Sequence, residues 1–157
     1  MDLKNQFIAE LAEAHQATQA LLKELETAHQ ANRELYPTWT VKELLSHLAG
    51  WDDACIAALN ALSAGAAGPT PAVVGFDPFN AASVGKRMDL SLAEVIADWD
   101  ARRDLFLKAI RDLPEEKVDA VMVFPWGPSG TLAEMVAIFV EHEREHAEEI
   151  RKKILTY

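Results

Sequence analysis

Cysteine and long apolar runs are almost absent from this sequence. The 157 residues include a single cysteine, Cys55, so no disulfide can form within the chain and no zinc site can be built from several thiolates. No apolar run approaches the roughly 20 residues that a membrane-spanning helix needs. The first residues, Met1 to Lys4, also lack the basic start and apolar core of a signal peptide. These absences predict a soluble protein of the cytoplasm.

Basic residues are also few. Lysine and arginine number 15 against 25 aspartates and glutamates, which gives a formal net charge of -10. A surface of that sign repels nucleic-acid phosphates and anionic lipid head groups, so we expect no nucleic-acid partner and no membrane partner. Half of the residues are hydrophobic, and a chain of this length can bury a sizeable core without a disulfide. The sequence therefore predicts one domain over residues 1–157.

Alternation of apolar and polar residues, which is typical of a half-buried strand, is never sustained. Residues 118–124 are the best strand candidate, with a loop edge as the alternative. Helical periodicity is strong instead, and it predicts a first helix over residues 3–35 that ends before Pro37. Three further helices are predicted to start at capping boxes, in which a hydroxyl residue stands three positions before a glutamate: Thr40–Glu43, Ser91–Glu94 and Thr131–Glu134.

Four amphipathic helices around one core predict an all-α protein, a four-helix bundle. The link between the first two helices, residues 36–39, is short, so these helices should be antiparallel neighbours. The next connection, residues 63–90, is rich in glycine and proline and long enough to cross the bundle. Such a crossover lets the second and third helices run parallel. A second irregular loop, residues 124–128, precedes the last helix.

Three histidines lie on the apolar stripes of two predicted helices. His142 and His146 are four residues apart, so their rings project from one face of the last helix. His47 lies on the inward stripe of the second helix, between Leu44 and Trp51. Two histidines from one helix and one from another make three ligands with an open position, the pattern of a catalytic metal site. The alternative is that the rings are hydrogen-bonded at the rim of the bundle.

Several segments resemble the DinB/YfiT-like superfamily of metal-dependent enzymes. They are residues 39–52, which read WTVKELLSHLAGWD, the pair Phe79–Asn80, residues 131–135, and residues 142–151 with both histidines. Their order and spacing cover essentially the whole chain. The resemblance implies an up-down-down-up four-helix bundle that forms a homodimer. It also implies a divalent metal held by three histidines, which match His47, His142 and His146.

The same resemblance implies a range of activities. The family includes S-transferases that use mycothiol or bacillithiol, a maleylpyruvate isomerase, and ClbS-type proteins that open a cyclopropane in a genotoxin. We therefore expect one divalent transition metal, zinc or nickel before iron or manganese, that activates a thiolate or water for S-transfer or hydrolysis of a small electrophile. A low-molecular-weight thiol is the expected partner. The alternatives are a non-catalytic protein that sequesters a small molecule and a metal-free dimeric bundle.

Residues 142–146 also match H-E-x-x-H, the metalloprotease pattern in which the glutamate is the general base. Zincins usually take a third ligand from further along the chain, and little chain follows His146 here. The sequence also lacks an edge strand to hold a peptide. A protease is therefore disfavoured. Glu143 is a weak candidate for a base and is predicted to lie on a solvated face, because its side chain points about 100° away from His142.

The remaining candidates have plainer interpretations. His15 is predicted to be a hydrogen-bonded core histidine, His29 to be solvated, and Cys55 to act as a small hydrophobe. Three polar residues could orient a ligand histidine or lie on the surface: Asp52, Asp53 and Asn80. Four aromatic residues are expected to fill the core or plug loops, although the loop of the last two could roof a pocket: Trp39, Trp51, Phe124 and Trp126.

Overall fold

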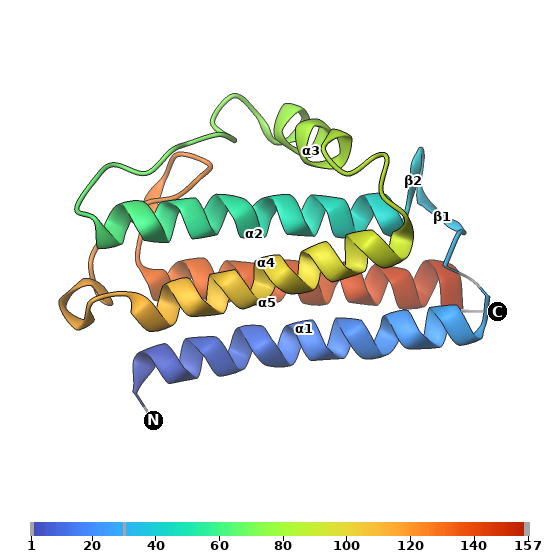
Figure 1. Cartoon of the computed structure of the whole chain (residues 1–157), viewed down its shortest axis with the longest axis horizontal. Helices are drawn as coiled ribbons and strands as arrows, with labels where there is room; N and C mark the ends of the chain where they lie inside the picture. The colour runs from blue at the N-terminus through green and yellow to red at the C-terminus, as the bar shows by residue number, and fades with distance from the viewer. Residues whose placement is uncertain (1, 30, 156–157) are drawn as a thin grey trace.

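The computed structural model describes residues 2–29 and 31–155. Most of them lie in four long helices, as predicted: α1 (Leu3–Thr27), α2 (Val41–Ser63), α4 (Leu92–Asp112) and α5 (Leu132–Ile150). Figure 1 shows α1 and α5 running in one direction along the bundle and α2 and α4 in the other. The all-α fold with up-down-down-up topology is therefore confirmed. No helix in the described ranges is long and apolar enough to cross a membrane.

The three capping boxes form as predicted and place the starts of α2, α4 and α5. In each box the glutamate carboxylate accepts the backbone N–H of the cap residue, at 2.8 Å for Glu43 and Thr40. The predicted first helix is wrong at its end. It stops at Thr27, and the following chain forms a hairpin of β1 (Glu34–Tyr36) and β2 (Trp39–Thr40) instead. In this hairpin Leu35 is buried in the core.

Both irregular connections contain short elements. The crossover from α2 to α4 includes the ten-residue helix α3 (Phe76–Gly85), which lies on the outside of the bundle in Figure 1. The connection before α5 holds the turn η1 (Glu115–Lys117) and the pair β3 (Met122–Val123) and β4 (Ser129–Gly130). The strand predicted over residues 118–124 is thus only two residues long. After α5 the chain continues as a short π-helix, η2 (Arg151–Leu155).

The core falls into two apolar halves along the bundle. One half contains the start of α1 and the end of α2, and includes Phe106 and Phe139. The other contains the end of α1 and the start of α2, and includes Trp99 and Ile150. Buried polar side chains from all four helices lie at the level between these halves: His15, Asp52, Arg103 and Glu143.

Gly50 lets α3 approach α2 closely. A Cβ atom at this position would lie 2.1 Å from Oγ and 2.4 Å from Cβ of Ser83. We therefore expect Gly50→Ala to destabilise the protein by about 1–3 kcal/mol in urea unfolding, because α3 must move outward. Adding Ser83→Gly should recover part of the loss. An alanine variant as stable as the wild type would contradict this close packing.

Candidate metal centre

The three predicted histidines meet between α2 and α5. Nε2 of His142 lies 3.3 Å from Nε2 of His47 and 3.0 Å from Nε2 of His146. One nitrogen from each ring lies within 4.8 Å of the other two. The helices cause this convergence, since His47 lies on the inward face of α2 while His142 and His146 are one turn apart on α5. The side chains that the sequence singled out are therefore brought together.

The outer ring nitrogens of two of these histidines are held by hydrogen bonds. His47 Nδ1 lies 2.8 Å from Oδ1 of Asn80, which also accepts Nε1–H of Trp51 at 3.2 Å. Two donors on one atom identify it as the amide oxygen. His47 therefore carries its proton on Nδ1 and a lone pair on Nε2. His146 Nδ1 likewise donates to the Glu149 carboxylate at 3.0 Å.

Burial keeps all three rings neutral near pH 7. Burial lowers the pKa of His47 to about 4, with a further contribution from the neighbouring His142. Burial lowers the pKa of His146 to about 3, and His142 and His47 lower it further. The pKa of His142 is lowered by burial against the pull of nearby glutamates. Neutral imidazole is the form that binds a metal, so no proton has to be displaced from these groups.

The arrangement fits a metal ion. Nitrogens that are each about 2.0–2.1 Å from one ion at tetrahedral or octahedral angles lie about 2.8–3.4 Å apart. The two separations at His142 fall in that range. Outer hydrogen bonds to a carboxylate or amide oxygen are also the usual companions of metal-binding histidines. The donor set consists of imidazole nitrogens, which suit zinc, nickel, copper and iron.

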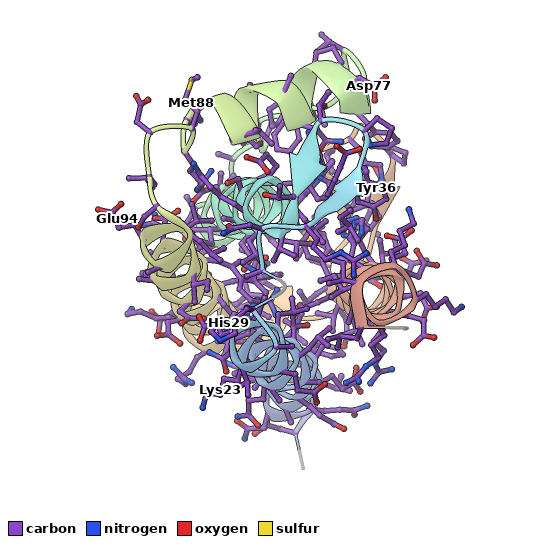
Figure 2. The ribbon with its side chains drawn as sticks, turned by 90° about the vertical axis from the view of Figure 1, so that its right-hand side faces the viewer. Lys23, His29, Tyr36, Asp77, Met88 and Glu94 are labelled. Atoms are coloured by element: carbon purple, nitrogen blue, oxygen red, sulfur yellow. The ribbon has the colours of Figure 1, made fainter. Side chains whose placement is uncertain are left out.

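The histidines border a cavity of about 680 Å³. Its walls come from the hairpin, α2, α3, the loop between β3 and β4, and α5. Figure 2 looks down the bundle from the hairpin end and shows Tyr36 on the hairpin. The Tyr36 hydroxyl lies 3.2 Å from Nδ1 of His146. The volume is within the range of pockets that bind small molecules.

Comparison with known families gives an assignment consistent with this geometry. The profile of the DinB superfamily matches residues 9–150. The chain belongs to the DinB superfamily. The resemblance noted in the sequence is thereby confirmed.

Two solved structures have the same fold as this DinB protein. The mycothiol-dependent maleylpyruvate isomerase gives a TM-score of 0.76 at 13% identity, covering 94% of this chain and 60% of that chain. A mutant of the mycothiol-dependent maleylpyruvate isomerase gives the same TM-score and coverage at 11% identity. The DinB chain therefore spans about 60% of the length of these structures. Curated protein sequences give no significant match.

Glu143 was predicted to lie on a solvated face, and this prediction is wrong. Its side chain is only 2% exposed, and Oε2 lies 2.8 Å from Nη2 of Arg103. The reason is that α5 buries more than its apolar stripe, because Arg103 on α4 supplies a compensating charge inside the bundle. Asp52 pairs with the same guanidinium, at 2.9 Å from Nε, and so does not orient a histidine of the site. Asp53 pairs with Arg87 at 2.9 Å.

Most other interpretations hold. His15 is buried and hydrogen-bonded to Asp100 at 2.8 Å, and His29 is exposed. Cys55 is fully buried, and burial raises the pKa of its thiol. Among the aromatic residues, Phe124 is in the core. Trp126 lines the cavity, as the expected roof implies. Trp39 and Trp51 line it as well, which their expected place in the core or in loops did not include.

Sequence reasoning missed three residues of this region. Tyr36 and Glu149 contact His146, and Arg103 binds both buried carboxylates. Glu149 had a usable signal, because it follows His146 by three positions on the same helix. Arg103 had one as well, since it stands on the apolar stripe of α4 between Trp99 and Phe106. Tyr36 had none, because the hairpin was not predicted.

The lowered pKa of His47 predicts an acid sensitivity of the metal-free protein. The unfolded chain takes up a proton near the ordinary pKa of 6.5, whereas the folded protein does so only near pH 4. Stability is therefore lost as the pH falls through this interval. Between about pH 7 and about pH 4.5, with a chelator present, His47→Gln should lose about 2–3 kcal/mol less than the wild type. Urea unfolding at both pH values measures this difference, and equal losses would contradict it.

Proposed function

We propose that this DinB protein is a metal-dependent enzyme that acts on a small electrophile by S-transfer or hydrolysis. In this proposal His47, His142 and His146 hold one divalent transition metal, zinc or nickel before iron or manganese. The observation that carries it is the convergence of three neutral imidazole nitrogens at the wall of a cavity large enough for a small molecule.

The metal, when bound, would act as a Lewis acid that favours the deprotonated form of a thiol or a water molecule. The protein's own residues prepare the site. Asn80 holds the proton of His47 on Nδ1, and Glu149 does the same for His146, so that both Nε2 lone pairs face inward. The Tyr36 hydroxyl stands beside the same atom of His146. The ring orientations are therefore fixed before any ligand arrives.

The cavity walls supply binding and the exclusion of water. Trp51 packs at a tilt against Phe79, with ring centroids 4.4 Å apart, and lies 5.8 Å from Trp126. These contacts tie α2, α3 and the β3–β4 loop together around the histidines. A small molecule that enters is held against apolar rings, which positions it beside the three nitrogens.

A low-molecular-weight thiol is the proposed second substrate. Support comes from the solved structure of the mycothiol-dependent maleylpyruvate isomerase, which shares the fold. Its isomerase activity is not part of the proposal, since identity is low and the chain covers only 60% of that structure. We further propose that the protein forms a homodimer, on the basis of the family resemblance, and that it acts in the cytoplasm, as its sequence pattern predicts.

The test is turnover. Untagged protein loaded with zinc or nickel is incubated with a chromogenic electrophile and a low-molecular-weight thiol such as cysteine, bacillithiol or mycothiol. We expect product formation that depends on the protein, disappears with a chelator and returns when metal is restored. A protein that binds metal but turns over no thiol or water reaction with any electrophile would support sequestration instead. A protein that binds no metal would favour the metal-free bundle.

A further inference from the structure

The wall of the cavity is built from aromatic rings. Six of the residues that line it are tryptophan, tyrosine or phenylalanine, and they come from the hairpin, α2, α3, the β3–β4 loop and α5: Tyr36, Trp39, Trp51, Phe76, Trp126 and Phe139. Four of these rings form a continuous surface. Trp51 lies 5.8 Å from both Phe76 and Trp126, and Trp126 stacks on Phe139 at 6.4 Å between centroids. Such a surface offers faces and edges for a further planar ring.

Among the residues that the structure describes, the same wall carries no charge. No described lining residue is aspartate, glutamate, lysine or arginine. Two charged groups beside it have contacts of their own: Glu149 accepts from His146, and the exposed Lys153 lies over the Tyr36 ring, 4.3 Å from its centroid. An anion away from the histidines would therefore lose its hydration without gaining a cation. The protein as a whole, at a net charge of -10, also repels anions.

We propose that this cavity takes a small molecule whose body is an uncharged aromatic ring system, and that it rejects anions of the same shape. The proposal rests on the proposed function only for what happens at the histidines, because the ligand class follows from the wall. A metal ion at the histidines would attract one negative group there. It would not change the rest of the wall, which holds the body of the ligand.

Two fluorescent probes with one skeleton test the proposal directly. N-phenylnaphthylamine is neutral, and anilinonaphthalene sulfonate adds one sulfonate to the same rings. In chelator-treated protein we expect the neutral probe to bind at least about tenfold more tightly than the sulfonate. The titrations are repeated at about 0.5 M salt, which screens the long-range repulsion of the acidic surface. Zinc-loaded protein should still bind the neutral probe.

A pair of arginine substitutions shows whether the wall itself sets this preference. Ile138 lines the cavity and is 45% exposed, while Leu105 on α4 is 42% exposed and lies outside the lining. Ile138→Arg should raise the affinity for the sulfonate relative to the neutral probe by at least about tenfold. Leu105→Arg adds the same charge elsewhere and should leave the ratio unchanged. Trp126→Ala should weaken the binding of the neutral probe.

The outcomes separate this inference from the proposed function. If the protein takes up metal but does not bind the neutral probe, the ligand class is overturned and the enzyme proposal stays intact. The same holds if the protein takes up metal and binds the sulfonate as tightly as the neutral probe at both salt concentrations. Selective binding of the neutral probe by a protein that takes up no metal supports the ligand class and sinks the enzyme proposal. An equal change in the ratio of the two probe affinities in both arginine variants also overturns the ligand class, because the net charge of the protein would then explain the effect.

Discussion

Replacing His47 with alanine is expected to remove metal binding almost completely. The wild-type protein should contain about one divalent ion per chain, and the variant should bind it at least about 100-fold more weakly. The reason is that His47 is the single nitrogen from α2 in the cluster, the other two being on α5. Loss of an outer partner such as Asn80 typically weakens a metal site 10–100-fold, so loss of a ligand should exceed that.

The measurement is plasma mass spectrometry on untagged protein purified without a nickel column, followed by zinc titration of chelator-treated protein. The double variant His142→Ala/His146→Ala should behave like His47→Ala, and Asn80→Ala should lie between it and the wild type. His29→Asn is the matched control. His29 is exposed and has a positive φ of 54°, a conformation that asparagine tolerates. A wild-type protein that takes up neither zinc nor nickel would refute the site.

The capping boxes show which part of the fold a single sequence can predict. Thr40, Ser91 and Thr131 place three helix starts correctly, because the hydrogen bonds of a capping box join residues only three positions apart. The end of α1 was not predictable in this way. Leu35 continues an apolar pattern and suggests more helix, whereas pairing of β1 with β2 and burial against the bundle decide its conformation.

Helix α3 was missed for a related reason. Its segment lies in a stretch rich in glycine and proline, which indicates a loop. Pro78 nevertheless stands in the first turn of α3, where its missing N–H costs nothing. The helix is held by tertiary contact, with Ser83 against Gly50, and this placement brings Asn80 to His47. The sequence offered Asn80 only as one of three possible partners for a histidine.

The cluster of three histidines could be anticipated because its signal is local on each helix. Histidines at helical spacing on an apolar stripe point into the bundle wherever the helix packs. The role of Glu143 could not be anticipated, since its burial depends on a charge from another helix. No pattern within α5 distinguishes a glutamate that meets water from one that meets Arg103.

Replacing Arg103 is expected to cause a large loss of stability. Its guanidinium binds Asp52 through Nε at 2.9 Å and Nη2 at 3.2 Å, Glu143 at 2.8 Å and the carbonyl oxygen of Leu11 at 3.1 Å. All three charged side chains are at most 3% exposed. Arg103→Met should therefore reduce the free energy of unfolding by about 3–5 kcal/mol, because two buried carboxylates are left without their cation. Urea unfolding near pH 7 measures the loss.

Arg102→Met is the matched control for this substitution. Arg102 is the preceding residue on α4, its side chain is 34% exposed, and its contacts with Asp53 and Asp98 are 3.5 and 3.6 Å long. Half-exposed ion pairs of this kind contribute at most about 1 kcal/mol. A loss in Arg103→Met no larger than in Arg102→Met would mean that the buried pairs do not hold the helices together.

The loss in Arg103→Met should also depend on pH, and the sign of this dependence follows from Asp52. Burial already raises the pKa of Asp52 to about 6, against the attraction of Arg103. Without that attraction the folded variant binds protons more tightly than the unfolded chain, whose aspartate has a pKa near 3.8. Its stability therefore rises as the pH falls, and the deficit should be smaller at about pH 5 than at about pH 7. A deficit that is constant over this range would locate the damage in lost packing, since the arginine stem also fills the core.

Replacing Asp52 and Glu143 by leucine in the same variant removes the buried charges altogether, and should recover most of the stability if charge is the cause.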